Sequence, residues 1–244
     1  MIILFGLAKN PEEGQAVEVN PTATNPEQGI RKNKIEDHCV LKGKFVIAGT
    51  GSLQLINESA EYIDKIKSYL IALLGDAKTM HGANKVAVIS GMAEGFDEFI
   101  ALAAVEADVP FIAAVPNKGY VQHYWSAPKQ GKPRSGSRTG MNRMPQVTSL
   151  LNKAVEVVYV CASLVSNMPK YGGRFGSANL ERNEWMVDRA SLVWAYNPNK
   201  DIGTQHCVGY CKQARIPVFD IVVDNEDGGG VKLQRPTTMR MDQM

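Results

Sequence analysis

The chain has 244 residues, of which 44% are hydrophobic and 21% charged, and this is the composition of an ordinary globular protein with a sizeable core. Its formal net charge of +2 is too small to indicate a nucleic-acid-binding protein by itself. The four cysteines lack metal-binding spacing and are too few for a disulfide framework, so we expect reduced thiols and a cytoplasmic protein.

Residues 1–43 are expected to form an irregular N-terminal extension. Residues 1–7 are apolar but short and follow no basic segment, which favours a strand or a docking arm over a signal peptide or a membrane span. Residues 8–43 are rich in Pro, Asn, Glu and Gly and show no sustained period. We expect this segment to fold only against the core or a partner subunit. It therefore suggests a homo-oligomer, and we expect no membrane contact.

From residue 45 onward, apolar runs alternate with amphipathic helical patterns. Strands are predicted at 45–49, 86–89, 111–115, 155–161, 192–196 and 218–223. Helices are predicted around apolar positions 63–74 and at 96–107, 146–153, 179–189 and 203–214. Strands that are apolar throughout, alternating with such helices, indicate a parallel sheet covered on both faces. We therefore predict an α/β fold, a Rossmann-like three-layer domain with a mostly parallel central sheet over 44–223, followed by a flexible tail at 224–244.

A long connection at about 117–145 interrupts this alternation. It lies within a stretch without Asp or Glu that carries these basic residues: Lys118, Lys129, Lys132, Arg134, Arg138, Arg143 and Lys153. Aromatic residues Tyr120, His123, Tyr124 and Trp125 lie near its start. Such a loop can close over the phosphates of a nucleotide, or follow a nucleic-acid backbone while its aromatic rings stack on bases. It can also be a solvated insertion without a ligand.

The turn after the second predicted strand combines glycines with acidic residues. Gly91 and Gly95 allow a tight bend and a close approach to a ligand, and Glu94, Asp97 and Glu98 follow at the helix start. These acids can simply complement the helix dipole. Alternatively, because three carboxylates repel a phosphate, the turn receives ribose hydroxyls, with Asp97 or Glu94 as the acceptor.

A second turn before residue 203 suits a phosphate better. No acid is expected at this helix start itself, and Thr204 can cap the helix or contact a phosphate oxygen. Arg182 on the preceding helix can bind the same phosphate with two parallel hydrogen bonds. The alternatives are a plain strand-to-helix connection and a surface Arg182 paired with Glu181 or Glu184.

Four segments together resemble the SLOG (SMF/DprA-LOG) superfamily, most closely its YpsA-like branch. They are Gly51-Ser52, the stretch 90–97, Arg-Asn-Glu-Trp-Met-Val-Asp-Arg-Ala at 182–190, and Ile-Gly-Thr at 202–204. The resemblance covers about residues 45–222 and implies a Rossmann-like fold that binds nucleotides or their derivatives at these turns. The ligand-binding positions that it implies, together with the residue chemistry above, are Gly51, Ser52, Gly91, Glu94, Gly95, Asp97, Arg182, Asn183, Gly203 and Thr204.

Members of this superfamily differ in activity. LOG-type enzymes hydrolyse the N-glycosidic bond of nucleoside 5′-monophosphates, DprA-type members bind single-stranded DNA, and others sense nucleotide signals. In this chain Asn183 replaces the Lys of the Arg-Lys-x-x-Met motif, and Cys207 stands at the Glu of the Gly-Thr-x-x-Glu motif. We therefore predict a nucleotide-binding or sensing protein first.

The alternatives are a nucleotide hydrolase with Glu94 or Asp97 as its carboxylate and a single-stranded nucleic-acid binder. No cofactor and no metal site is expected, because Cys207 and Cys211 share a helix face in the manner of small buried residues.

Overall fold

The computed structural model describes residues 40–51, 58–128, 136–137, 139–197, 201–224 and 230–234. These residues build a seven-stranded sheet in the order β4-β3-β2-β1-β5-β6-β7. The strands are β1 (Phe45–Gly51), β2 (Val86–Ser90), β3 (Phe111–Val115), β4 (Glu156–Tyr159), β5 (Leu192–Tyr196), β6 (Val218–Asp224) and β7 (Gly230–Gln234). Neighbouring strands are parallel, except that β7 pairs antiparallel with β6.

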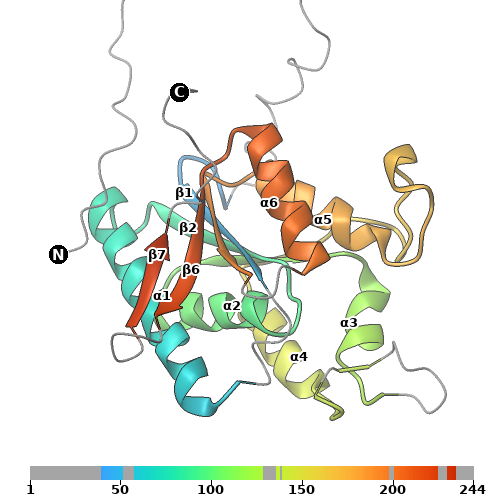
Figure 1. The fold of residues 1–244 in the computed structure, drawn as a ribbon, viewed down its shortest axis with the longest axis horizontal. Helices are drawn as coiled ribbons and strands as arrows, with labels where there is room; N and C mark the ends of the chain where they lie inside the picture. The colour runs from blue at the N-terminus through green and yellow to red at the C-terminus, as the bar shows by residue number, and fades with distance from the viewer. Residues whose placement is uncertain are drawn as a thin grey trace, which may run out of the picture. The chain divides into compact units, whose positions relative to one another are not determined.

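Helices cover both faces of this sheet (Figure 1). They are α1 (Ala60–His81), α2 (Phe96–Glu106), α3 (Lys118–Tyr124), α4 (Met144–Lys153), α5 (Ser177–Val187) and α6 (Ile202–Ala214), and a short 3-10 helix spans Pro169–Tyr171. Ile47 and Val88 belong to a core shared with α1, α2 and α4, whereas Val46 and Ala48 pack with α5 and α6. Alternate residues of buried strands thus face opposite helical layers, as the pleat requires. The predicted Rossmann-like α/β fold is confirmed.

The order of the strands reverses beside β1. The chain runs from β1 through β2 and β3 to β4 on one side, then crosses back to place β5 on the other side of β1. In such sheets the loops that leave β1 and β5 diverge, which leaves a crevice at the carboxyl ends of the strands. The topology therefore makes this edge of the sheet the expected place for a ligand.

Helix α2 packs unusually close to the central strand. A Cβ atom on Gly49 would lie 2.7 Å from Cγ2 of Ile100, and one on Gly51 would lie 2.4 Å from Cβ of Phe96. Both distances are far below van der Waals contact, so side chains at these positions would push α2 away from β1. Gly51 thus has a packing role at the carboxyl end of β1.

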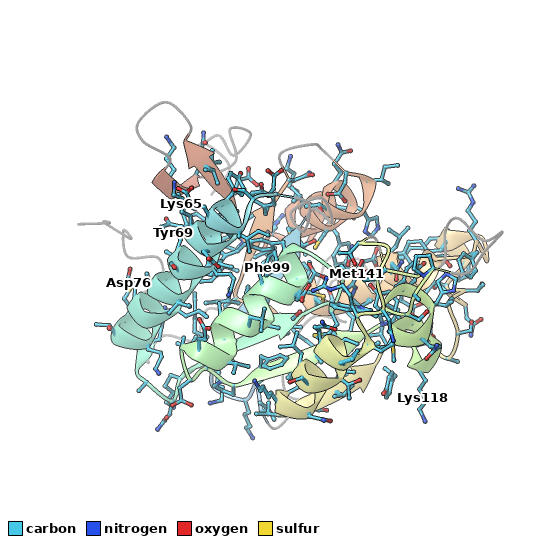
Figure 2. The ribbon with its side chains drawn as sticks, turned by 90° about the horizontal axis from the view of Figure 1, so that it is seen from below. Lys65, Tyr69, Asp76, Phe99, Lys118 and Met141 are labelled. Carbon is cyan, nitrogen blue, oxygen red and sulfur yellow. The ribbon has the colours of Figure 1, made fainter. Side chains whose placement is uncertain are left out.

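Two elements differ from the sequence-based predictions. Helix α3 lies inside the connection expected as an irregular loop, and β7 lies inside the expected flexible tail. Strand β7 is held by tertiary contacts: Val231 and Leu233 pack against the core beside α1, and the backbone N–H of Leu233 donates to the hydroxyl of Tyr69 at 2.8 Å. Figure 2 labels Tyr69 on α1, beside this part of the sheet. Residues 1–39 and Ser52 lie outside the described residues.

Candidate ligand-binding site

A cavity of about 220 Å³ opens at the carboxyl end of β1, beside which the strand order reverses, and is bordered by the turns that follow β2 and β5. Both turns singled out in the sequence border it, so segments about a hundred residues apart meet there. Its lining residues are Thr50, Gly51, Ala93, Glu94, Asp97, Tyr120, Tyr124, Gly136, Asn179, Arg182, Asn183, Asp201, Gly203 and Thr204. A wider open depression of about 740 Å³ between α1 and β7 includes Lys65 and Tyr69, but it lies away from both turns.

The turn between β2 and α2 is fixed by hydrogen bonds within the protein. The hydroxyl of Ser90 donates to the carbonyl of Asp97 at 2.6 Å and accepts from the N–H of Met92 at 3.1 Å. The indole N–H of Trp125 donates to the carbonyl of Met92 at 3.1 Å. Gly95 precedes α2 with φ of 91°, a conformation that favours glycine. The predicted requirement for glycine at Gly95 therefore has a conformational cause.

Asp97 and Arg182 form a buried ion pair at one wall of the cavity. Nη1 of Arg182 lies 3.2 Å from Oδ2 of Asp97 and also donates to the carbonyl of Gly91. Each residue is only 5% exposed. A Cβ on Gly91 would lie 1.6 Å from Nη1 of Arg182. Gly91 therefore makes room for the guanidinium, which joins α5 to the turn.

The alternative placement of Arg182 on the surface is wrong. Glu181 accepts a hydrogen bond from Ser166, and Glu184 pairs with Lys170, so neither glutamate receives Arg182. Within the described residues, Nε of Arg182 is a buried donor without a hydrogen-bond partner. A buried donor of this kind is costly unless a ligand or water satisfies it. The described protein groups thus leave one donor of the guanidinium unsatisfied.

The buried position of Asp97 changes its acidity. Desolvation raises the pKa of Asp97 from 3.8 to about 6, although Arg182 and the backbone N–H groups of Ala93 and Gly51 act in the opposite direction. The nearby carboxylate of Asp201 adds to the increase. Asp97 therefore changes its charge close to neutral pH, which is the range where a carboxyl group can exchange protons with a ligand or with water.

The other two acids of this turn have partners in the basic connection. Ser137 donates to Oε1 of Glu94 at 2.5 Å, and Nη1 of Arg143 lies 3.5 Å from the same oxygen. Nη2 of Arg143 lies 2.6 Å from Oε1 of Glu98. Burial raises the pKa of Glu98, while Arg143 opposes this shift. At least one basic residue of the connection therefore faces inward and neutralises the acidic turn.

The second turn carries an acid, contrary to the sequence-based expectation. Helix α6 begins at Ile202 and Asp201 is its N-cap, accepting from the N–H of Thr204 at 3.0 Å and from its hydroxyl at 2.7 Å. The carboxylate thus occupies two donors that a phosphate would use. The carbonyl of Gly203 accepts from the side-chain amide of Asn183 at 3.1 Å, which ties α5 to the same turn.

Several lining residues were not among the predicted site residues. Tyr120 and Tyr124 come from α3, Asn179 comes from α5, and Asp201 caps α6. The Asp-x-x-Thr spacing at 201–204 was a usable capping signal, because an N-cap side chain bonds the N–H two or three residues further on. The aromatic cluster at 120–125 was visible, but its position at the cavity depends on a helix that has no clear apolar period.

Among the described residues, no cluster of three or more His, Cys, Asp or Glu side chains has the geometry to hold a metal ion. Cys207 and Cys211 lie on α6 and are buried in the core. Within the same part of the chain, none of the helices has the length and apolar character needed to cross a bilayer.

Comparisons with known proteins find only weak similarity between this fold and solved structures. No family model and no curated protein matches the sequence. The fold is similar to DNA processing protein A from Streptococcus pneumoniae, at 14% identity and a TM-score of 0.46 over 80% of this chain and 54% of that one. The chain thus spans about half the length of that protein.

Two further solved structures are similar to a comparable degree. One is DNA processing protein A from Helicobacter pylori, whose structure was described for its single-stranded DNA binding mode; the identity is 13% and the TM-score 0.47, over 78% of this chain and 71% of that one. The other is TM1055, a structural genomics target, at 14% identity and a TM-score of 0.42, over 76% of both chains. Similarity at this level assigns neither a family nor a ligand.

Proposed function

We propose that this protein binds a nucleotide-derived small molecule whose sugar occupies the cavity between the β2–α2 turn and the start of α6. The observation that carries the proposal is the convergence of Asp97, Arg182 and Asp201 on one cavity at the reversal of strand order. Open parallel sheets bind their ligands in this position. The resemblance of the turn sequences to nucleotide-binding proteins supports the same class of ligand.

The charges of the lining favour a hydroxyl-rich group inside the cavity. Glu94, Asp97 and Asp201 contribute carboxylates to the lining. Among the described lining residues, Arg182 alone carries a guanidinium, and it is already paired with Asp97. Carboxylates accept hydrogen bonds from sugar hydroxyls and repel phosphate. We therefore revise the sequence-based assignment of the phosphate to the turn at 203, because Asp201 occupies its donors.

The size of the cavity agrees with a sugar. Its volume of about 220 Å³ is below the roughly 300–1,000 Å³ typical of pockets that enclose a drug-sized ligand. A complete nucleotide would therefore extend beyond the cavity, with its sugar inside and its base or phosphates at the mouth.

The direct test is to identify small molecules released from the purified full-length protein by mass spectrometry, followed by calorimetric titration with nucleoside monophosphates and ribose 5-phosphate. We expect a ribose-containing ligand, and binding weakened at least tenfold in Asp97→Asn. Asp76→Asn is the matched control, because Asp76 is exposed on α1 (Figure 2) and does not line the cavity. Failure to release any such ligand, together with no binding of the titrated compounds, would refute the proposal.

The raised pKa of Asp97 supports hydrolysis of an N-glycosidic bond as a second candidate function. With a pKa of about 6, it is mostly ionised at pH 7 and can take a proton from a water molecule. That water attacks C1′ of the sugar, the C1′–N bond breaks, and the base leaves with the electron pair and is then protonated. Cys207 cannot replace this carboxylate, because its side chain is buried in the core.

Chromatography distinguishes binding from hydrolysis. A hydrolase releases free base and ribose 5-phosphate from a nucleoside monophosphate, and Asp97→Asn abolishes this release. A binding protein retains the intact nucleotide. The third sequence-based alternative, single-stranded nucleic-acid binding, stays a prediction: Arg134 and Arg138 lie outside the described residues, and the described Arg143 faces the protein interior.

A further inference from the structure

A row of aromatic rings leads from the cavity to the protein surface. Tyr120 and Tyr124 line the cavity, and their ring centroids are 4.7 Å apart. The ring of His123 lies 4.5 Å from that of Tyr124 and 5.3 Å from that of Phe175. Phe175 ends the row and is 62% exposed. The row therefore joins residues of α3 to the segment that precedes α5.

Local structure holds Phe175 beside the cavity. Phe175 pairs with Val165 in an antiparallel bridge, and the next residue, Gly176, is the N-cap of α5. A Cβ on Gly176 would lie 3.9 Å from the hydroxyl oxygen of Tyr124, which places this backbone next to a lining residue. The exposed phenyl ring is therefore fixed at the site by its own backbone and by the edge of His123.

We propose that Phe175, supported by His123, is a stacking platform for the planar heterocyclic base of the ligand. The inference rests on the proposed function and adds the part of the site that recognises the base. The cavity has the volume of a sugar-sized group, so a base attached to that sugar would lie at the mouth. Bases stack on aromatic side chains through their faces, and an exposed ring beside a polar pocket is the surface that such a group needs.

A stacking role explains why Phe175 is exposed, since packing of the core does not require its ring. Phe175 does not belong to either hydrophobic core cluster, and its exposure leaves most of its apolar surface in water. Base stacking on an aromatic ring contributes about 1–3 kcal/mol per base, whichever base is present. The platform therefore increases affinity for nucleosides in general, while the cavity recognises the sugar.

The test compares a ligand that has a base with one that lacks it. The probes are AMP, GMP, CMP and UMP, with ribose 5-phosphate as the base-free match, titrated into wild type, Phe175→Ala and Phe175→Trp. We expect Phe175→Ala to weaken nucleoside monophosphate binding by about fivefold or more and to leave ribose 5-phosphate binding unchanged. Phe175→Trp should restore the affinity, and its added fluorescence should be quenched by the nucleotides but not by ribose 5-phosphate.

Tyr159→Ala is the matched control, because Tyr159 is an exposed aromatic residue on β4 that does not line the cavity. If Phe175→Ala binds the nucleotides as wild type does, or loses both kinds of ligand equally, the platform is overturned while the sugar site stands. If wild type binds none of the probes, the proposed function fails and the platform fails with it.

Discussion

At Gly91, a hydrogen atom in place of a side chain leaves room for the guanidinium of Arg182. In Gly91→Ala the new methyl group would collide with Nη1, since the distance to an ideal Cβ is 1.6 Å. Displacing Arg182 would leave buried Asp97 without its cation, so we expect a loss of about 3–5 kcal/mol in the free energy of unfolding and loss of ligand binding. Chemical denaturation measures the first effect and calorimetry the second.

Gly75→Ala is the control for this substitution. Gly75 is exposed within α1, and no atom lies within 4 Å of its ideal Cβ. Alanine there should increase stability by up to about 1 kcal/mol. Wild-type stability and binding in Gly91→Ala would show that the ion pair does not depend on this close approach.

The raised pKa of Asp97 predicts how stability depends on pH. The folded protein holds this proton more tightly than the unfolded chain, because the pKa is about 6 in the folded protein and 3.8 for an ordinary aspartate exposed to water. Ionisation of Asp97 therefore costs stability above pH 6, and this cost disappears as the pH falls toward 4. Relative to Asp97→Asn, the wild type should become more stable over that interval, and denaturant unfolding at several pH values measures the change.

Ligand affinity should follow the same titration. Protonation converts the Asp97 carboxylate into a poorer acceptor for sugar hydroxyls, so binding should weaken as the pH falls through 6. Calorimetric titrations between pH 5 and 8 measure this midpoint, and the Asp97→Asn variant should not show it. A midpoint near 4 would mean that the carboxyl group is well hydrated rather than buried.

At the scale of elements, ion pairs of Arg143 connect the start of α4 to the start of α2. Its guanidinium contacts Glu94 and Glu98, whose side chains are buried. Arg143→Ala removes the cation from both carboxylates, so the free energy of unfolding at pH 7 should fall by about 3–5 kcal/mol. The loss should shrink at acidic pH, because the pKa of Glu98 is already raised by burial and its protonated form needs no cation.

Lys65→Ala provides the comparison for Arg143. Lys65 and Glu61 form an exposed pair within α1 at 3.1 Å. Removing one partner of such a pair should change stability by about 0.5 kcal/mol or less. Denaturant unfolding of both variants at pH 7 and pH 5 completes the test, and an equal effect of the two substitutions would contradict the buried role of Arg143.

Elements with strong local patterns were predictable from the sequence. The apolar runs of β3 and β5 coincide with their predicted bounds, because both strands are buried between helical layers. Helix α3 and strand β7 were missed because their stability comes from distant contacts, such as burial of Tyr120 and the bond from Leu233 to Tyr69. Short segments of this kind carry little signal of their own.

The candidate site was predictable in position but not in its internal contacts. The glycine-containing turns pointed to the edge of the sheet where the cavity lies, since parallel strands end together there. The pairing of Arg182 with Asp97 joins residues 85 positions apart and depends on tertiary packing. Phe175 gave no signal, because one exposed aromatic residue forms no periodic pattern. The sequence therefore indicated the edge of the sheet at which the cavity lies, but not the balance of charges that line the cavity.

For the molecule as a whole, the strand order predicts where the structure opens most readily. Central strands β1, β2 and β5 have neighbours on both sides, whereas β4 and β7 are edges of the described sheet. Amide hydrogen exchange should therefore be slowest in the three central strands and fastest in the two edge strands. A saturating ligand should further slow exchange at residues 91–97 and 201–204, since binding stabilises the folded site by mass action.

Mass spectrometry of exchanged peptides can follow all these segments in one experiment. Strand β7 serves as the internal reference, because it lies away from the cavity and should respond little to the ligand. Protection that is uniform across the sheet would contradict the predicted order of opening. A ligand effect confined to β7 would contradict the assignment of the site.

The contact of α2 with β1 through Gly49 and Gly51 has a consequence for affinity. Because the helix rests directly on the central strand, the turn that carries Asp97 cannot shift without disturbing the middle of the sheet. The wall of the site is thus ordered when the chain folds, and little conformational entropy remains to be lost when a ligand arrives. We therefore expect even a sugar-sized group to bind measurably, because little of its binding free energy is offset by ordering of the site.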